Sequence, residues 1–312
     1  MTGRLSWVRS SHTVKTGFDV SRTYYNQPQY SNVRGSYRFG QRFTGHSIGD
    51  LLVGRLQSVN RRVQTTYNEL RSTGFGLYLN DDWKITGDFT LNLGLRYEVE
   101  LPPYDANDRL STYEPALNKV VLAGDRSLPK LQQLLSAHGM SDRTVLAREV
   151  GMGRQLIDPD LNNLSPRVGF AWRPFGDSRR VIRGGYGIYY QGYLLGPVRW
   201  QLAGVFPFTF NQTFNATGGG NLPPPTLRNP FPEGRARIGG QGIQNVAGFD
   251  TDPPTAYLQS WNLTVEQDLG GGQAVEIGYV GSKGSHLQRQ YDLNQPIRDP
   301  ALATVSRTGT LV

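Results

Sequence analysis

FTLNLGLRYEV, residues 89–99, is the stretch that decides the fold of this chain. Every second residue from Phe89 to Val99 is apolar or aromatic, and the residues between them are polar, charged or glycine. Successive side chains of a β-strand point to opposite faces, so this alternation predicts a strand with one apolar and one polar face.

The same alternation recurs along the chain, in pairs of runs that are separated by a short turn. These pairs lie at 5–20, 75–99, 165–190 and 261–279. The segments that connect the pairs are much longer and rich in Pro, Asn, Gly and Asp; they run through roughly 25–50, 101–164 and 191–256. Short turns that alternate with long loops are typical of outer-membrane barrels, in which the short turns face the periplasm and the long loops face outward.

We therefore expect an all-β protein, an antiparallel up-and-down transmembrane β-barrel to which this chain contributes about eight strands. Helical membrane spans are not expected, because no run approaches the eighteen or so consecutive apolar residues that they need. Aromatic residues are expected in bands at the two lipid–water boundaries. One band would hold Trp83, Phe89, Trp172 and Phe175 beside the short turns, and the other Tyr97, Tyr186, Tyr190, Tyr257 and Trp261.

If the apolar face meets lipid, the charged residues of the strands must face inward. An arginine on the lipid side at the midplane would cost about 2–4 kcal/mol. The charged residues predicted to line the lumen are Arg96, Glu98, Arg167, Arg173, Arg183, Glu266 and Glu276. The sequence thus predicts a polar, wet interior.

The formal net charge of +8 is carried mostly by arginines. These are spread singly among the strands and form no cluster, so no nucleic-acid partner is predicted. The chain has no cysteine, which excludes disulfides and thiolate metal sites. Its histidines, at 12, 46, 138 and 286, lack the spacing of metal ligands.

No group of residues resembles a catalytic constellation, so the chain is predicted not to be an enzyme and to hold no cofactor or metal. Asp158, Asp160 and Asn162 imitate the opening of a calcium loop. Asn163 stands where that loop needs glycine, and Gly169 where it needs glutamate. We interpret these residues as loop chemistry.

A short helix is expected in the first long connection, at 47–56. Its apolar residues Ile48, Leu51 and Leu52 fall at helical spacing. We therefore expect them to pack inward.

Several stretches resemble the TonB-dependent outer-membrane receptors. YLNDDWKIT at 78–86, followed by LNLGLRYE at 91–98, is similar to a signature of that family. Further stretches resemble its Oar-like branch: SPRVGFAW at 165–172, RGGYGIYY at 183–190, QSWNL at 259–263 and GYVGS at 278–282. The resemblance covers roughly residues 10 to 295.

The resemblance implies a barrel of about 22 strands around an N-terminal plug, in the outer membrane of a Gram-negative bacterium. It implies uptake or passage of a ligand across that membrane, driven through the TonB complex. No plug domain or TonB-contact segment is recognisable within 1–312, so these residues are expected to be a fragment, a partial barrel domain. The implied partners are outer-membrane lipid, the remainder of the barrel and plug, the TonB complex through the N-terminal part, and an unknown extracellular ligand.

One alternative of another class stays open: a soluble or cell-surface β-sandwich that binds carbohydrate through Tyr and Trp in its loops. A sandwich also alternates its faces. It would not usually place nearly all its loop length at one end, which favours the barrel.

Overall fold

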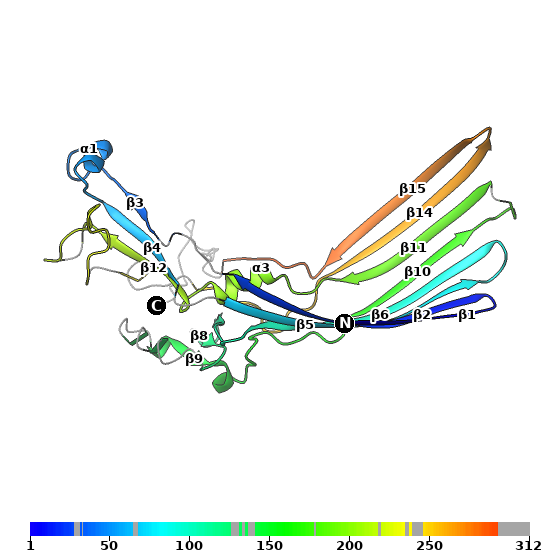
Figure 1. Cartoon of the computed structure of the whole chain (residues 1–312), viewed down its shortest axis with the longest axis horizontal. Coiled ribbons are helices and arrows are strands. Elements are labelled where there is room, and N and C mark those ends of the chain that lie inside the picture. The colour runs from blue at the N-terminus through cyan, green and yellow to red at the C-terminus, as the bar shows by residue number, and fades with distance from the viewer. Residues whose placement is uncertain are drawn as a thin grey trace, which may run out of the picture.

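A computed structural model shows the chain as a long curved sheet with smaller folded elements at one end (Figure 1). The structure describes residues 1–27, 32, 34–64, 68–125, 131–132, 135–136, 141–177, 179–217, 220–234, 237–238 and 246–292. No helix in this described part is long and apolar enough to span a membrane.

The main element is an eight-stranded antiparallel sheet in which the strands follow one another in chain order. Its strands are β1 (Thr2–Arg9), β2 (His12–Gln27), β5 (Asn68–Lys84), β6 (Phe89–Asp105), β10 (Leu164–Trp172), β11 (Arg180–Tyr190), β14 (Tyr257–Gly270) and β15 (Gln273–Ser285). The up-and-down arrangement and the number of strands confirm the prediction. In the described part of the chain the sheet is open, with β1 and β15 at its two ends.

The register of the strands separates the side chains into two faces. Leu95 lies across from Leu79 and Pro166, while its neighbour Arg96 lies across from Tyr78 and Ser165. We call the side with Leu95 the apolar face and the side with Arg96 the polar face. The apolar face is exposed: Leu79, Leu95 and Ile277 have 53%, 48% and 72% of their surface accessible. Such a large exposed apolar surface indicates contact with lipid or another partner.

Aromatic rings lie over glycines at directly paired positions of the apolar face. The pairs are Phe18 with Gly3, Phe170 with Gly184 and Trp261 with Gly281. A Cβ on Gly281 would come within 2.5 Å of the Trp261 ring. Rings that cover a neighbouring strand's glycine in this way help to fix the register of the sheet.

The long connections fold into a second region, which we call the loop cap. Figure 1 shows its elements at the opposite end of the sheet from the short turns. One small sheet contains β3 (Ser36–Arg38), β4 (Ser58–Gln64), β12 (Thr209–Asn215) and β13 (Arg237–Ile238), and the other β7 (Ser111–Glu114), β8 (Lys119–Leu122) and β9 (Thr144–Leu146). Short helices complete it: α1 (Ser47–Leu52), α3 (Leu195–Val198), and the single turns Ser141–Arg143, Ala147–Val150 and Arg199–Ala203.

The loop cap holds nearly all of the buried hydrophobic side chains in the described residues. Its largest cluster joins Leu110, Val121 and Leu156 from the connection after β6 to Val198 and Leu202 from the connection after β11. These loops are therefore a packed body whose core lies mostly outside the main sheet, with Leu70 of β5 as its fully buried member from that sheet. This was not predicted.

The prediction for the first helix is half right. α1 forms, but Ile48, Leu51 and Leu52 are exposed, so the expectation that they pack inward is wrong. The buried residue is Asp50, whose carboxylate accepts hydrogen bonds from the backbone N–H groups of residues 42–44 and from the Thr44 hydroxyl. Polar contacts, and not apolar packing, hold this helix in place.

Acidification should release this helix. Burial raises the pKa of Asp50, but the hydrogen bonds from Thr44 and the two preceding N–H groups outweigh burial and lower the pKa below its usual range. A lowered pKa stabilises the fold above the usual pKa of Asp, and this stabilisation is lost as the pH falls below about 4. Hydrogen exchange, corrected for intrinsic rates, should show residues 42–44 losing protection over this range. Asp50→Asn should lack this pH dependence; unchanged protection of the unsubstituted protein at low pH would contradict the assignment.

Asp81 lies on the apolar face, where a charge is unexpected. The structure pairs it with His12, whose Nδ1 lies 2.7 Å from the Asp81 carboxylate. The His12 ring in turn stacks on Trp83, with 5.1 Å between ring centroids. The group lies beside the short turns, because His12 is the first residue of β2 and Trp83 stands one residue before the end of β5.

Removing His12 alone should therefore lower the free energy of unfolding more than removing His12 and Asp81 together. His12→Ala leaves the Asp81 carboxylate without its hydrogen-bond partner, and we expect a loss of about 1–2 kcal/mol in the free energy of unfolding. The His12→Ala, Asp81→Ala double variant should recover part of this loss. Urea unfolding in lipid vesicles measures these variants and Asp81→Ala, and strictly additive effects of the two single substitutions would show that the pair is not coupled.

Candidate functional site

The charged residues predicted to line the lumen all lie on the polar face. The register places Arg96, Glu98, Arg167, Arg183, Glu266 and Glu276 on this side, and Arg173 follows β10 at the turn. Glycines at 94, 169, 185, 187 and 278 share it. Whether this face lines a lumen stays a prediction.

The structure brings some of these residues together and keeps others apart. Arg96 bridges Asp19 and Glu98, at 2.9 and 2.5 Å. Arg183 pairs with Glu266 at 2.9 Å, and Glu276 lies across from Glu266 on the end strand. The ion pair with Arg183 offsets the repulsion between Glu266 and Glu276, which face each other in the register.

The two remaining arginines have different surroundings. Arg167 lies over the ring of Tyr189, 4.6 Å from its centroid. Arg173 contacts Asp88 and the backbone of Gly87 beside the short turns. The charged candidates therefore form separate groups spread over the polar face and do not converge on one centre.

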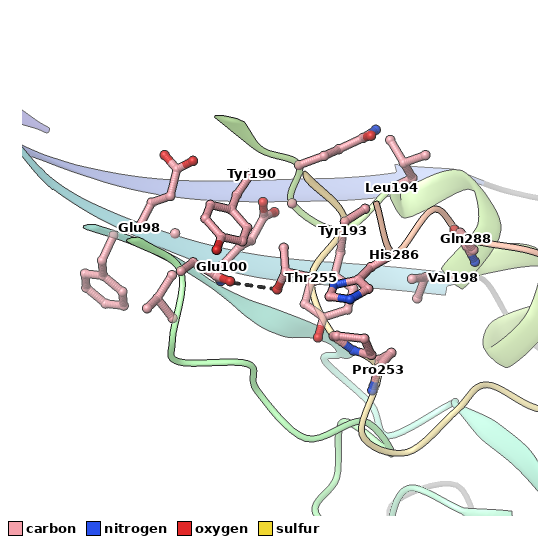
Figure 2. A pocket seen from close by; sticks show the side chains of 18 of the residues that line it. Glu98, Glu100, Tyr190, Tyr193, Leu194, Val198, Pro253, Thr255, His286 and Gln288 are labelled. Atoms are coloured by element: carbon pink, nitrogen blue, oxygen red, sulfur yellow. Dashed lines mark hydrogen bonds between the residues drawn. The ribbon is translucent and has the colours of Figure 1, made fainter. Parts of the chain in front are cut away.

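A cavity of about 530 Å³ lies where the main sheet meets the loop cap; residues of the polar face such as Glu98 and of the apolar face such as Phe75 and Val99 line it. Figure 2 shows Glu98, Glu100, Tyr190, Tyr193 and His286 gathered around it. They come from the far end of β6, from the end of β11 and the loop after it, and from the segment after β15. Ligand pockets are commonly about 300–1,000 Å³, so the cavity can hold a small organic molecule. It is the candidate site.

One wall of the cavity is fixed by a polar network around Asn163. This residue is buried, with 2% of its surface exposed, and its Nδ2 donates to the Asp160 carbonyl and to Thr255 Oγ1, each at 3.2 Å. The bond to Thr255 is the dashed line in Figure 2. The Asn163 carbonyl accepts from the Glu98 N–H, which ties this loop to β6. Asn163 Oδ1 has no hydrogen-bond partner within the described residues.

The aromatic side of the cavity is built from tyrosines. Tyr190 packs against Tyr257, with ring centroids 5.5 Å apart, and His286 meets Tyr257 edge-on at 5.3 Å. Tyr193 follows in the loop after β11 and also lines the cavity. The rings present flat, partly apolar surfaces next to the polar groups.

The electrostatic environment in the loops around the cavity is negative. Burial, followed by the nearby charges of Asp160 and Glu100, raises the pKa of Tyr193 to about 12. Burial also raises the pKa of Asp160, but hydrogen bonds from Thr255 and Asn162 outweigh burial and lower it. Asp160 is therefore a stable anion, and Tyr193 keeps its proton at physiological pH.

The pKa of Glu100 is shifted in the opposite direction. Glu100 lies in β6, just after residues 89–99, which the sequence predicts as a strand with one apolar face. Burial raises its pKa, and a hydrogen bond from the Ser72 hydroxyl at 3.2 Å offsets only part of this effect. A carboxylate with so little compensation inside the protein favours a positively charged neighbour.

Sequence reasoning missed this site. Asp160 was interpreted as loop chemistry, which its bonds to Asn162 and Thr255 fit, and His286 was set aside for lack of metal spacing. The position of Asn163 directly before β10, opposite the end of β6, has no signal in one sequence. Within the described residues, no three His, Asp or Glu side chains lie close enough to hold a metal ion.

Comparison with known proteins identifies the family. A family model described as "Outer membrane beta barrel domain" matches residues 1–311. A search of curated proteins finds no relative of this chain. The match agrees with the single up-and-down sheet and its exposed apolar face. The chain therefore belongs to the family of outer membrane β-barrel domains, and it resides in the outer membrane of a Gram-negative bacterium.

Proposed function

We propose that this chain is part of the wall of a TonB-dependent transporter, of the Oar-like branch, that takes up or passes a ligand across the outer membrane. The observation that carries the proposal is the polar face. Charged residues and glycines extend in register from strand to strand, and residues of this face line part of the cavity at the loop cap. Such a face fits the lining of a water-filled passage for polar solutes better than it fits a dry core.

The open ends of the sheet support the proposed partners. Backbone groups of a strand edge need hydrogen-bond partners in lipid, so β1 and β15 favour pairing with further strands of a larger barrel. The partners we propose are outer-membrane lipid on the apolar face, the remainder of the barrel with its plug domain, the TonB complex through the N-terminal part of the receptor, and an extracellular ligand. We propose neither an enzymatic activity nor a nucleic-acid partner.

The alternative, a carbohydrate-binding β-sandwich, has less support. A sandwich buries the apolar face of one sheet against a second sheet about 10 Å away. Here Leu95 and Ile277 on that face are exposed. The small sheets of the loop cap lie beyond the end of the main sheet and leave this face open (Figure 1).

Comparative depletion of the growth medium tests transport without knowledge of the substrate. The native organism, a strain without this gene and a strain without TonB are grown in the same rich medium, and the remaining solutes are measured by mass spectrometry. We expect at least one solute to remain when either the gene or TonB is absent, and the double deletion to add nothing. Loss of uptake that depends on the gene but not on TonB would indicate a passive pore instead. No difference between the strains would overturn the proposal.

A further inference from the structure

The cavity is acidic in a protein that is basic overall. Asp19, Glu98 and Glu100 line it together with one arginine, Arg96, while the whole chain has a formal net charge of +8. Arg96 is already bound to Asp19 and Glu98. Glu100 has a single hydroxyl partner, Ser72, and forms no ion pair with any described residue. Among the described residues, the Glu100 carboxyl group therefore has no cationic partner in the lining.

A second, independent feature is the unused acceptor of Asn163. Its amide nitrogen is fully engaged, since both bonds of Nδ2 go to the protein. Its Oδ1 is buried on the cavity wall and lacks a partner among the described residues. Buried carbonyl groups are nearly always hydrogen-bonded in folded proteins, so this atom points to a donor supplied from the cavity. Glu98 and Glu100 line the same cavity.

The aromatic wall suits the same kind of occupant. Tyr190 and Tyr193 both line the cavity, and Tyr190 is braced by Tyr257. The faces of aromatic rings attract cations and pack against aliphatic stems. An anionic ligand would meet the carboxylates instead. A neutral one would leave Glu100 without a cationic partner.

We propose that this cavity binds an organic cation of the guanidinium or ammonium class, with its N–H groups on the Glu100 carboxylate and Asn163 Oδ1 and its stem against Tyr190 and Tyr193. This inference rests on the proposed function, because it names the class of ligand that the transporter captures outside the cell. The cavity volume of about 530 Å³ fits a side chain or short peptide of this kind.

The test uses two peptides that differ only in charge. The protein as its gene encodes it is purified from outer membranes in detergent, and calorimetry measures binding of acetyl-Ala-Arg-Ala-amide and of the same peptide with neutral citrulline in place of arginine. We expect the arginine peptide to bind at least tenfold more tightly. Equal affinities, binding of neither peptide at millimolar concentration, or binding of maltotriose in preference to both would overturn the proposal.

Variants connect this selectivity to the cavity. Glu100→Gln should reduce the preference for the arginine peptide at least fivefold. Gly192→Ala should also reduce it, because a Cβ there would lie 1.5 Å from Glu100 Oε2 and displace the carboxylate. Glu114→Gln in β7 is the matched control, since glutamine can still accept from the Ala116 N–H. A preference unchanged in Glu100→Gln, with folding verified by heat-dependent mobility in gels, would place the cation elsewhere and overturn the assignment.

Failure of this inference can be told apart from failure of the proposed function. If the arginine peptide binds selectively but the medium shows no depletion that depends on the gene and on TonB, the ligand class stands and transport fails. If depletion depends on both, but the depleted solutes are neutral or anionic, transport stands and the cationic ligand is wrong.

Discussion

Leu95→Arg is expected to lower the free energy of unfolding in lipid vesicles by about 2–4 kcal/mol, the cost of an arginine on the lipid side near the membrane midplane. Leu95 lies on the exposed apolar face, across from Leu79 and Pro166. Neither neighbour can neutralise the guanidinium. Urea unfolding followed by tryptophan fluorescence measures the loss.

The control places the same side chain on the other face of the same strand. Asn92 donates to Asp82 at 2.7 Å, and an arginine at this position keeps that carboxylate as a partner. Asn92→Arg should therefore change the free energy of unfolding by well under 1 kcal/mol, as surface charge substitutions commonly do. Equal losses for the two variants would contradict the assignment of lipid to the apolar face, and a larger loss for Asn92→Arg would mean that the polar face meets lipid.

The main sheet could be predicted because one of its faces meets lipid and the other meets polar surroundings. Successive side chains point to opposite faces, so apolar and polar residues alternate in the sequence with a period of 2, as they do at Leu95, Arg96 and Tyr97. The same period fixed which charged residues share a face, since a slip of one residue would expose Arg96 to lipid. Membrane strands can thus be recognised by their alternation, although each strand is short.

The loop cap was missed for the opposite reason. Val120, Val121 and Leu122 are all buried, so β8 shows no alternation, and its neighbours β7 and β9 have only three or four residues. Short apolar runs of this kind fit a buried strand or a buried helix segment equally well. The cap's core is also assembled from distant segments, such as Leu110 with Leu202, which no local pattern reveals.

The candidate site was missed because it depends on that assembly. Asn163 and Glu100 acquire their roles only when the connection before β10 crosses the end of β6 and the loop after β11 covers both. In the sequence they are an ordinary loop asparagine and one more strand glutamate. Their significance arises from burial, and burial here is decided by the cap and not by the sheet.

Leu202→Ala is expected to destabilise the loop cap by about 2–5 kcal/mol, the range for a fully buried leucine. Leu202 has 0% of its surface exposed and packs in the cluster that joins the connection after β6 to the connection after β11. The main sheet contributes little to that cluster, so it should stay folded while the cap opens. Protease added to intact cells should cut within the cap much faster, whereas heat-dependent mobility in gels should not change.

The cavity should respond together with the cap. Val198 belongs to the same buried cluster as Leu202 and also lines the cavity. Leu202→Ala should therefore weaken binding of the arginine peptide as it raises the rate of cleavage. Leu117→Ala is the control, because Leu117 lies in the cap but is exposed, and it should change neither property. If Leu202→Ala left cleavage and binding as they are, the loops would not act as one packed body. If it also unfolded the sheet, cap and membrane wall would form a single cooperative unit, and the ligand site could not open without the barrel.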